Sequence, residues 1–163
     1  MPSIRFILTI VLFPIAVQAA GRNVENYRVL LEGDQAAIVI HQCMREAPVA
    51  IQDTWVPEAA VVQKLDAQLP DIMALTSTLC CGAGDRVANL NRYYLQYAGL
   101  VIEGHKLIYI NALPADSANN EWRSKAVLSC TASTDYWGVL YDPENGLFSD
   151  LAFNGEPDDD EAH

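Results

Sequence analysis

Positively charged residues are scarce in this sequence. Its 163 residues include 10 Lys and Arg against 21 Asp and Glu, which gives a formal net charge of −11. A surface of that sign repels phosphate backbones and anionic lipid headgroups, and it speeds association with basic partners. We therefore predict no nucleic-acid ligand, and a basic protein is the class of partner that the composition favours.

Catalytic motifs are also missing. The sequence has no G-x-S-x-G elbow, no H-E-x-x-H helix and no glycine-rich phosphate loop, and its three histidines are His41, His105 and His163. A carboxylate pair such as Asp135 and Asp150 would suit acid–base hydrolysis, but any such pair is easily found among 21 acidic residues. We predict a binding protein rather than an enzyme, with no catalytic residue and no cofactor.

The sequence lacks a hydrophobic run of the roughly 20 residues that a membrane-spanning helix needs. Its most apolar stretch, residues 6–17, follows the basic Arg5 and precedes the small-residue exit at 17–19. This arrangement predicts a secretory signal peptide over residues 1–19, with an uncleaved anchor as the alternative. Cleavage would leave 9 basic and 21 acidic residues, a charge of 9 − 21 = −12. We expect a periplasmic or secreted protein without membrane insertion after cleavage.

Four cysteines remain, Cys43, Cys80, Cys81 and Cys130. In an oxidising compartment an even number predicts disulfides, and four cysteines allow three pairings. A direct bridge between neighbours would strain a short ring, because adjacent Cα atoms lie only about 3.8 Å apart. We therefore favour bonds from Cys80 and Cys81 to the two distant cysteines. A zinc site built from these residues and His41 lacks the usual ligand spacing, so no metal is predicted.

Residues 20–155 show no repeat and no linker, so we predict one α+β domain followed by an acidic disordered tail at 156–163. Residues 27–31 and 36–41 are short apolar runs around a turn signal, consistent with a hairpin, although a helix also fits such short runs. The segment that begins at Pro57 has apolar residues at helical spacing and contains Pro70, which must kink or restart the helix.

The second half favours strands. Residues 92–112 are rich in β-branched and aromatic residues around a compact turn, which we place at 103–105, so that Ile102 faces Lys106. In that register one sheet face is aliphatic, with Ala98, Leu100, Ile108 and Ile110. The other face is amphipathic, with Val101 and Leu107 beside a candidate binding face of Tyr93, Tyr97, Tyr109 and Asn111, and with Tyr109 opposite Gly99. A slip of one residue would exchange these assignments.

Residues 142–146 (DPENG) are turn chemistry between two further strand-like runs. Their apolar side chains are predicted to share one face: Trp137, Val139, Tyr141, Leu147, Leu151 and Phe153. The fold class that follows is α+β, an antiparallel sheet of four or five strands with a kinked helix packed on one face, stapled by disulfides.

The segments Trp55-x-Pro57, YYLQYAG (93–99), LIYINA (107–112) and YWGVLYDPENGLFSDLAFNG (136–155) give the chain a resemblance. It is similar to a group of uncharacterised small exported (periplasmic) proteins of Gram-negative bacteria. The resemblance spans most of the chain after the signal peptide and implies a periplasmic location. It implies no activity, cofactor or catalytic residue.

The leading hypothesis is a small acidic binding protein without catalytic activity, of the inhibitor or immunity type, directed at a basic envelope enzyme. Its tyrosine-bearing sheet face would supply contact area. A second interpretation, slightly preferred for these tyrosines, places them under the N-terminal hairpin as core. The alternatives in function are a cell-envelope hydrolase that uses paired carboxylates or His, and a peptide-binding structural or chaperone component.

Overall fold

The computed structural model describes residues 27–46, 48, 50–79 and 81–155. The predicted signal peptide (1–19) and acidic tail (156–163) therefore lie outside the described residues. Within the described ranges, no helix is long and apolar enough to cross a membrane.

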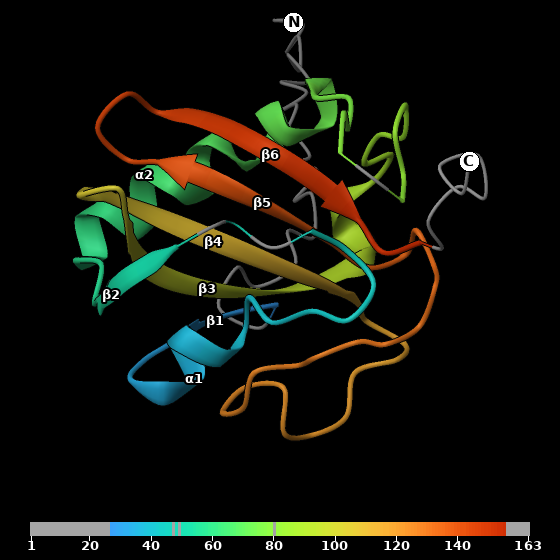
Figure 1. Ribbon diagram of the computed structural model, residues 1–163, viewed down its shortest axis with the longest axis horizontal. Helices are drawn as coiled ribbons and strands as arrows, with labels where there is room; N and C mark the ends of the chain where they lie inside the picture. The colour runs from blue at the N-terminus through green and yellow to red at the C-terminus, as the bar shows by residue number, and fades with distance from the viewer. Residues whose placement is uncertain (1–26, 47, 49, 80, 156–163) are drawn as a thin grey trace, which may run out of the picture.

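The chain forms an α+β fold built on one six-stranded sheet (Figure 1). In chain order the elements are β1 (Arg28–Leu31), α1 (Asp34–Ile38), β2 (Ile51–Trp55), α2 (Ala59–Gln68), the 3-10 helices η2 (Leu69–Ala74) and η3 (Leu90–Arg92), β3 (Tyr93–Ile102), β4 (His105–Pro114), β5 (Trp137–Asp142) and β6 (Leu147–Phe153).

The sheet is mixed, so the prediction of an antiparallel sheet of four or five strands is only partly right. The antiparallel part runs β3-β4-β5-β6, whereas β1 pairs with β3 in parallel. The short strands β1 and β2 share one edge of β3, β1 along residues 95–98 and β2 along 99–102. At Gly99 the β2 backbone approaches so closely that a Cβ would overlap the Trp55 carbonyl. Both edge strands are too short to carry a strong sequence pattern.

The predicted hairpin of residues 27–31 and 36–41 is wrong. Residues 28–31 do form a strand, but its partner is β3, and residues 34–38 form the single-turn helix α1 instead of a second strand. Gly33 precedes this helix with φ of 54°, a conformation that glycine adopts without steric cost. The periodicity of so short an apolar run does not separate a strand from a helix.

The β3–β4 turn is one residue shorter than predicted. Ile102 pairs with His105, so the loop has the two residues Glu103 and Gly104. Both have positive φ, 52° and 81°, as a type I′ turn requires. Glu is an unusual residue at the first of these positions, which is why the sequence did not reveal the tighter turn. The slip places Tyr109 opposite Ala98 rather than opposite Gly99.

One face of the sheet packs against α2 and η2. Leu65, Leu69 and Ile72 from these helices are buried against large side chains of the central strands. The predicted break at Pro70 is confirmed, because α2 ends at Gln68 and the chain continues as the 3-10 helix η2. The kinked helix therefore covers one sheet face, as the apolar spacing indicated.

The opposite face is covered only in part. Ala36, Val39 and Ile40, from α1 and the turn after it, pack on Ala98 and Leu100 of β3. Figure 1 shows α1 beside β1 and β2, at the edge of the sheet far from β6. The helix α1 and the turn after it thus cover the part of the sheet near β1, β2 and β3. They leave parts of β4, β5 and β6 uncovered, and a cavity lies there.

The β5–β6 hairpin has the predicted turn at 142–146. Five of the six side chains assigned to its inner face are buried there, but Leu147 is 65% exposed. The cause is a β-bulge: Leu140 pairs with Ser149, whereas Gly138 pairs with Ala152, so β6 contains one extra residue. The bulge shifts the alternation of side chains, and Phe148 packs on the inner face in place of Leu147.

A long irregular connection, residues 115–136, joins β4 to β5. Its central part, residues 122–131, is named the strap here. Gln96, fully buried on β3, attaches the strap with three bonds: Nε2 donates to the carbonyls of Trp122 and Lys125, and Oε1 accepts from the Val127 amide. Asn111 Nδ2 also donates to this Oε1. Side-chain amides therefore form the hydrogen bonds to the strap backbone that a neighbouring strand would otherwise form.

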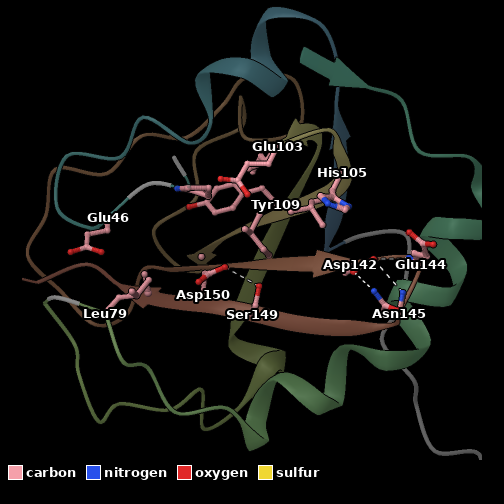
Figure 2. Close-up of a pocket in the computed structure, with 16 residues that line it drawn as sticks. Glu46, Leu79, Glu103, His105, Tyr109, Asp142, Glu144, Asn145, Ser149 and Asp150 are labelled. Atoms are coloured by element: carbon pink, nitrogen blue, oxygen red, sulfur yellow. Dashed lines mark hydrogen bonds between the residues drawn. The ribbon is translucent and has the colours of Figure 1, made fainter. Parts of the chain in front are cut away.

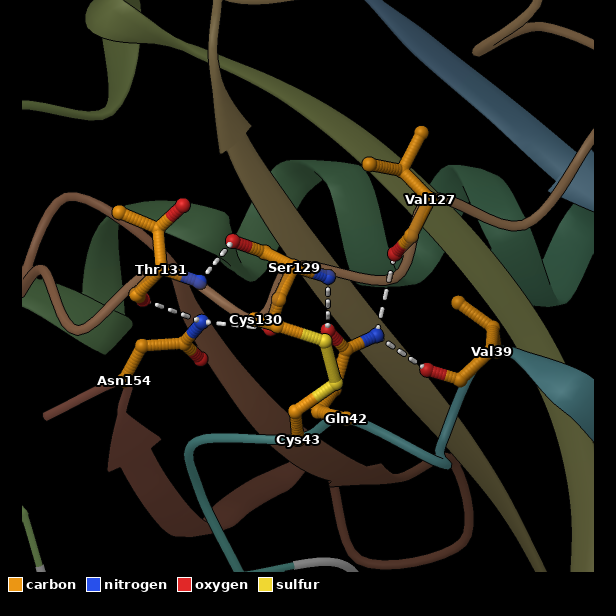
Figure 3. The surroundings of a disulfide bond; sticks show 8 residues. All are labelled: Val39, Gln42, Cys43, Val127, Ser129, Cys130, Thr131 and Asn154. Atoms are coloured by element: carbon orange, nitrogen blue, oxygen red, sulfur yellow. Dashed lines mark hydrogen bonds between the residues drawn. A yellow bond between two sulfur atoms is a disulfide. The ribbon is translucent and has the colours of Figure 1, made fainter.

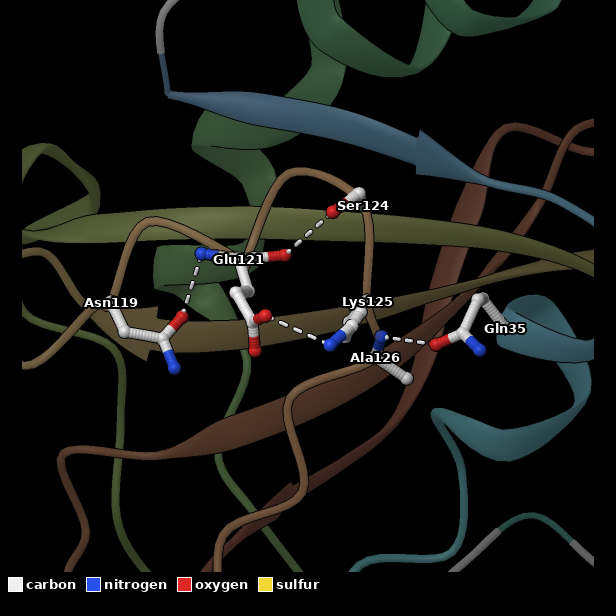
Figure 4. Close-up of polar contacts among 6 residues, drawn as sticks. All are labelled: Gln35, Asn119, Glu121, Ser124, Lys125 and Ala126. Atoms are coloured by element: carbon white, nitrogen blue, oxygen red, sulfur yellow. Dashed lines mark hydrogen bonds and ion pairs between the residues drawn. The ribbon is translucent and has the colours of Figure 1, made fainter.

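Four more amide side chains hold the strap: Gln35 to the amide of Ala126, Gln42 to Val127 and Ser129, Asn111 to Val127, and Asn154 to Ser129 and Thr131. Figure 3 shows the attachments by Gln42 and Asn154, and Figure 4 shows that by Gln35, with the ion pair of Lys125 and Glu121 beside it. Together the bonds satisfy backbone groups that would otherwise lack partners over the sheet.

Candidate functional site

A cavity of about 610 Å³ lies on the sheet face away from α2. Its floor consists of residues from three neighbouring strands: Leu107 and Tyr109 of β4, Gly138 and Leu140 of β5, Ser149 and Ala152 of β6. Glu46, Pro48 and Leu79 line its side. This volume is typical of pockets that hold a small molecule or a few side chains.

The cavity exists because the floor residues on β5 and β6 are small. Gly138, Ser149 and Ala152 leave space that larger side chains would fill. At Gly138 a Cβ would overlap the hydroxyl end of Tyr109, so the absence of a side chain lets the tyrosine ring lie across β5. The hollow is therefore part of the folded sheet and needs no movement to form.

Five carboxylates surround this floor: Glu46, Glu103, Asp142, Glu144 and Asp150. We call the cavity with these residues the acidic pocket. Figure 2 shows Glu46 at one side, Asp150 and Tyr109 near the middle, and Asp142 and Glu144 at the other side. His105 is the one basic residue among those that line it. The electrostatic potential in such a concave site attracts cations.

The β-bulge of β6 directs Asp150 to the pocket. Asp150 is the extra residue, with φ of 53°, and its Oδ2 accepts a hydrogen bond from the Ser149 hydroxyl. In a regular strand two successive side chains point to opposite faces, but both of these line the pocket. Positive φ is uncommon outside glycine, although Asp and Asn tolerate it better than most residues. The bulge thus adds a carboxylate to the floor.

Two turns of the sheet supply further carboxylates to the acidic pocket. Because consecutive hairpins alternate direction, the β3–β4 turn with Glu103 and the β5–β6 turn with Glu144 lie at the same end of the sheet. Asp142 accepts bonds from the backbone amides of Glu144 and Asn145 and from the Asn145 side chain. The Asn145 side-chain bond is the main reason that the pKa of Asp142 is lowered. Asp142 therefore stays ionised while it shapes the turn.

A buried arginine holds Tyr109 in place. Arg45 is 6% exposed and its Nε donates to the Tyr109 hydroxyl at 3.0 Å. Its other nitrogens donate to the side-chain oxygens of Asn111 and Asn154, and each of these three acceptors is uncharged. The guanidinium group also lies 5.9 Å from the centre of the Tyr109 ring. The floor of the acidic pocket is thereby tied to the strap by way of Asn111 and Asn154.

The predicted binding face of Tyr93, Tyr97, Tyr109 and Asn111 is not a surface. These side chains are 8%, 1%, 2% and 2% exposed. They also lie on opposite faces of the sheet, because the shorter β3–β4 turn moves Tyr93 and Tyr97 to the side of α2. Tyr109 reaches only the pocket floor. The tyrosines are core, as the second interpretation held, but Tyr93 and Tyr97 are covered by α2 and η2 and not by an N-terminal hairpin.

Tyr97 has a structural role beneath α2. Its hydroxyl donates to Asp66 of α2 at 3.0 Å, and Asp66 also forms an ion pair with Arg28 of β1. Burial raises the pKa of the Tyr97 hydroxyl far above its usual range, so the group stays protonated and acts as a donor. These three residues join the helix to two strands.

The disulfide prediction is corrected in its pairing. Cys43 bonds to Cys130, so neither is available to a neighbouring cysteine of the middle segment, and the favoured connectivity is wrong (Figure 3). Cys81 is disulfide-bonded too. Cys80 lies outside the described residues. The geometric reason is that the strap runs beside the chain that follows α1, which places Cys43 and Cys130 with Cα atoms 4.8 Å apart.

The other candidate sites do not assemble. Asp135 lines a small cavity with Arg92 and Pro114 at the far end of β4, whereas Asp150 lines the acidic pocket. The zinc site drawn with Cys43 is excluded by its disulfide. Within the described ranges, no group of three or more His, Cys, Asp or Glu side chains is placed to hold a metal ion.

Sequence reasoning missed most of the acidic pocket. It identified the turns at Glu103 and at 142–146 but treated them only as connections. Their location at the same end of the sheet follows from strand order alone, so it was predictable that both turns lie there. Glu46 comes from an irregular segment, and no pattern in the sequence indicates that it returns to the sheet.

Comparison of the chain with family models, curated proteins and solved structures gives no match.

Proposed function

We propose that this is a binding protein without catalytic activity that holds a basic partner at the acidic pocket. The observation that carries the proposal is the preformed cavity of about 610 Å³, with an apolar floor and five carboxylates around it. The apolar floor accepts the hydrocarbon part of a ligand, and the carboxylates pair with its charge. The formal net charge of −11 steers a basic partner toward the site from a distance.

The partner that fits is a basic periplasmic or secreted protein. A basic cell-wall enzyme is the specific form of the proposal, with this protein as its inhibitor or immunity factor. The signal-like N-terminus, the disulfide and the resemblance to exported proteins support an oxidising location, where such a partner would be met. Association driven by charge is fast at low salt and slows as salt screens the field.

A peptide-binding role at the sheet edge has less support. β6 is the last strand of the sheet, but its bulge at Asp150 and the adjacent carboxylate interrupt the regular edge that a peptide would extend. Bulges and charges are the usual devices that protect an edge strand from pairing.

The test is a capture experiment with the oxidised chain of residues 20–163 as bait, in envelope extract at low and moderate salt. Three baits are compared: the natural sequence, the pocket variant Glu46→Gln/Asp150→Asn, and the control Glu32→Gln/Asp71→Asn. The control removes the same charge from exposed positions elsewhere.

We expect a basic protein that is retained by the natural bait and by the control, released by salt, and lost from the pocket variant. A purified complex then gives the dissociation constant and an activity assay for the captured enzyme. Retention of the same protein by the pocket variant would refute the assignment of the site. Empty baits at both salt concentrations would refute the proposal.

A further inference from the structure

The carboxylates of the acidic pocket are spread along the sheet instead of gathered at one point. In the β5–β6 ladder Asp142 pairs with Leu147, and Leu140 pairs with Ser149, the neighbour of Asp150. Two residues of strand separate these pairs, which corresponds to about 7 Å. Glu46 lies farther along in the same direction (Figure 2). The pocket therefore has a turn end with Asp142 and Glu144 and a bulge end with Asp150 and Glu46.

The surface between the two ends is apolar and aromatic. Leu107 and Leu140 line it from adjacent strands, and Tyr109 crosses it with its hydroxyl held by Arg45. A hydrocarbon chain laid over these residues would lose contact with water, while charges at its ends would remain beside the carboxylates. Neither end alone uses the whole cavity.

A single compact cation does not match this arrangement. Among the described residues no three acidic, histidine or cysteine side chains converge on a metal position, so a divalent ion would meet the carboxylates of only one end. One ammonium group likewise would leave the carboxylates of the other end without a counter-charge. Two cations joined by methylene groups would serve both ends at once.

We infer that the acidic pocket recognises two ammonium groups joined by a flexible apolar chain. This inference rests on the proposed function and specifies the chemistry that the same site selects. Linear diamines have this chemistry. Two neighbouring lysine side chains of a basic protein present a similar pair of ammonium groups, each at the end of its own methylene chain. In either source the methylene groups lie on Leu107, Leu140 and Tyr109, and each ammonium group pairs with one end of the pocket.

The first measurement is a calorimetric titration of the oxidised chain with putrescine, with butylamine as the matched monoamine and Mg²⁺ as the compact divalent cation. We expect putrescine to bind at least tenfold more tightly than either control, because only putrescine engages both ends. Equal affinity of putrescine and butylamine would overturn the inference. So would Mg²⁺ that binds as tightly as putrescine, since charge alone would then explain binding.

Variants test the requirement for two ends. Glu46→Gln/Asp150→Asn neutralises the bulge end, and Glu103→Gln/Glu144→Gln neutralises the acids of the two turns. Each double variant is expected to weaken putrescine about tenfold and to leave butylamine within a few-fold of its original affinity. Asn is well suited to the positive φ at position 150, and thermal unfolding checks that both variants are folded.

The control Glu32→Gln/Asp71→Asn changes the net charge by the same amount at exposed sites outside the pocket. We expect its putrescine affinity to change less than twofold at moderate salt. A loss equal to that of the pocket variants would show a diffuse charge effect and overturn the inference.

A short peptide with two lysines one residue apart distinguishes the sources. Tighter binding of this peptide than of putrescine assigns the pocket to side chains of a partner, and the reverse order assigns it to a free amine. Either order supports the two-cation chemistry, whereas binding of neither probe refutes it. A captured basic protein that ignores the pocket variants would instead refute the site and leave the general role in binding basic partners.

Discussion

Replacement of Gln96 by Leu is expected to detach the strap from the sheet. Gln96 is fully buried, and its side chain bonds to the backbone of Trp122, Lys125 and Val127 and to the side chain of Asn111. Leu has a similar size and none of these bonding atoms. The substitution therefore tests the polar attachment with little change in packing volume.

The expected loss follows from the four bonds. At about 1 kcal/mol for each intramolecular hydrogen bond, their removal costs about 4 kcal/mol. The more apolar side chain returns about 1 kcal/mol by burial. The net destabilisation is thus about 3 kcal/mol, which for a domain of this size lowers the melting temperature by roughly 9 °C.

The assay combines urea unfolding with hydrogen exchange of the natural chain and the variant. Exchange of the Val127 amide should accelerate most, because its acceptor is Gln96 Oε1. Gln63→Leu on the exposed side of α2 is the control, with an expected change within about 0.5 kcal/mol. A loss below 1 kcal/mol for Gln96→Leu, with unchanged exchange at Val127, would refute the view that amide side chains hold the strap.

Three further changes test the Cys43–Cys130 disulfide, the turn at Asp142 and the floor of the acidic pocket at Gly138. Cys43→Ser/Cys130→Ser opens a crosslink with a sequence separation of 87 and should lower the free energy of unfolding by about 4.6 kcal/mol in the chain-entropy description, measured by urea unfolding. The pKa of Asp142 is lowered in the folded chain, so its stabilisation of the turn is complete above about pH 4 and is lost as pH falls through the folded pKa; hydrogen exchange of turn amides against pH should show this loss, and Asp142→Asn should abolish it. Gly138→Ala should displace Tyr109, destabilise the chain by about 1 to 3 kcal/mol and reduce cation binding, checked by thermal unfolding and calorimetry.

The parts of the fold that were predictable depend on local chemistry. Pro70 ends α2 because it lacks an amide hydrogen, and the Asp142–Gly146 segment has the residues that a turn requires. Both features follow from a few adjacent residues. The buried helix face was predictable for a similar reason, since helical spacing places Leu65, Leu69 and Ile72 together.

The parts that were not predictable depend on pairing between distant segments. Glu103 occupies a turn position that usually has Asn, Asp or Gly, and the register that results places Tyr93 and Tyr97 on the sheet face that α2 covers, opposite to Tyr109. Asp150 reaches the pocket only because of a bulge, and the alternation of apolar and polar residues in the sequence does not predict that bulge. The parallel pairing of β1 likewise depends on β3, far away in sequence.

The attachment of the strap by Gln and Asn side chains separates the stability of the scaffold from the strength of binding. Amide groups carry no charge and do not titrate in the ordinary pH range, so neither salt nor mild acid acts directly on these bonds. The attraction of the acidic pocket for cations, in contrast, weakens as salt screens its carboxylates. A wash with concentrated salt should therefore empty the pocket while the chain remains folded, and a return to dilute buffer should restore binding without refolding.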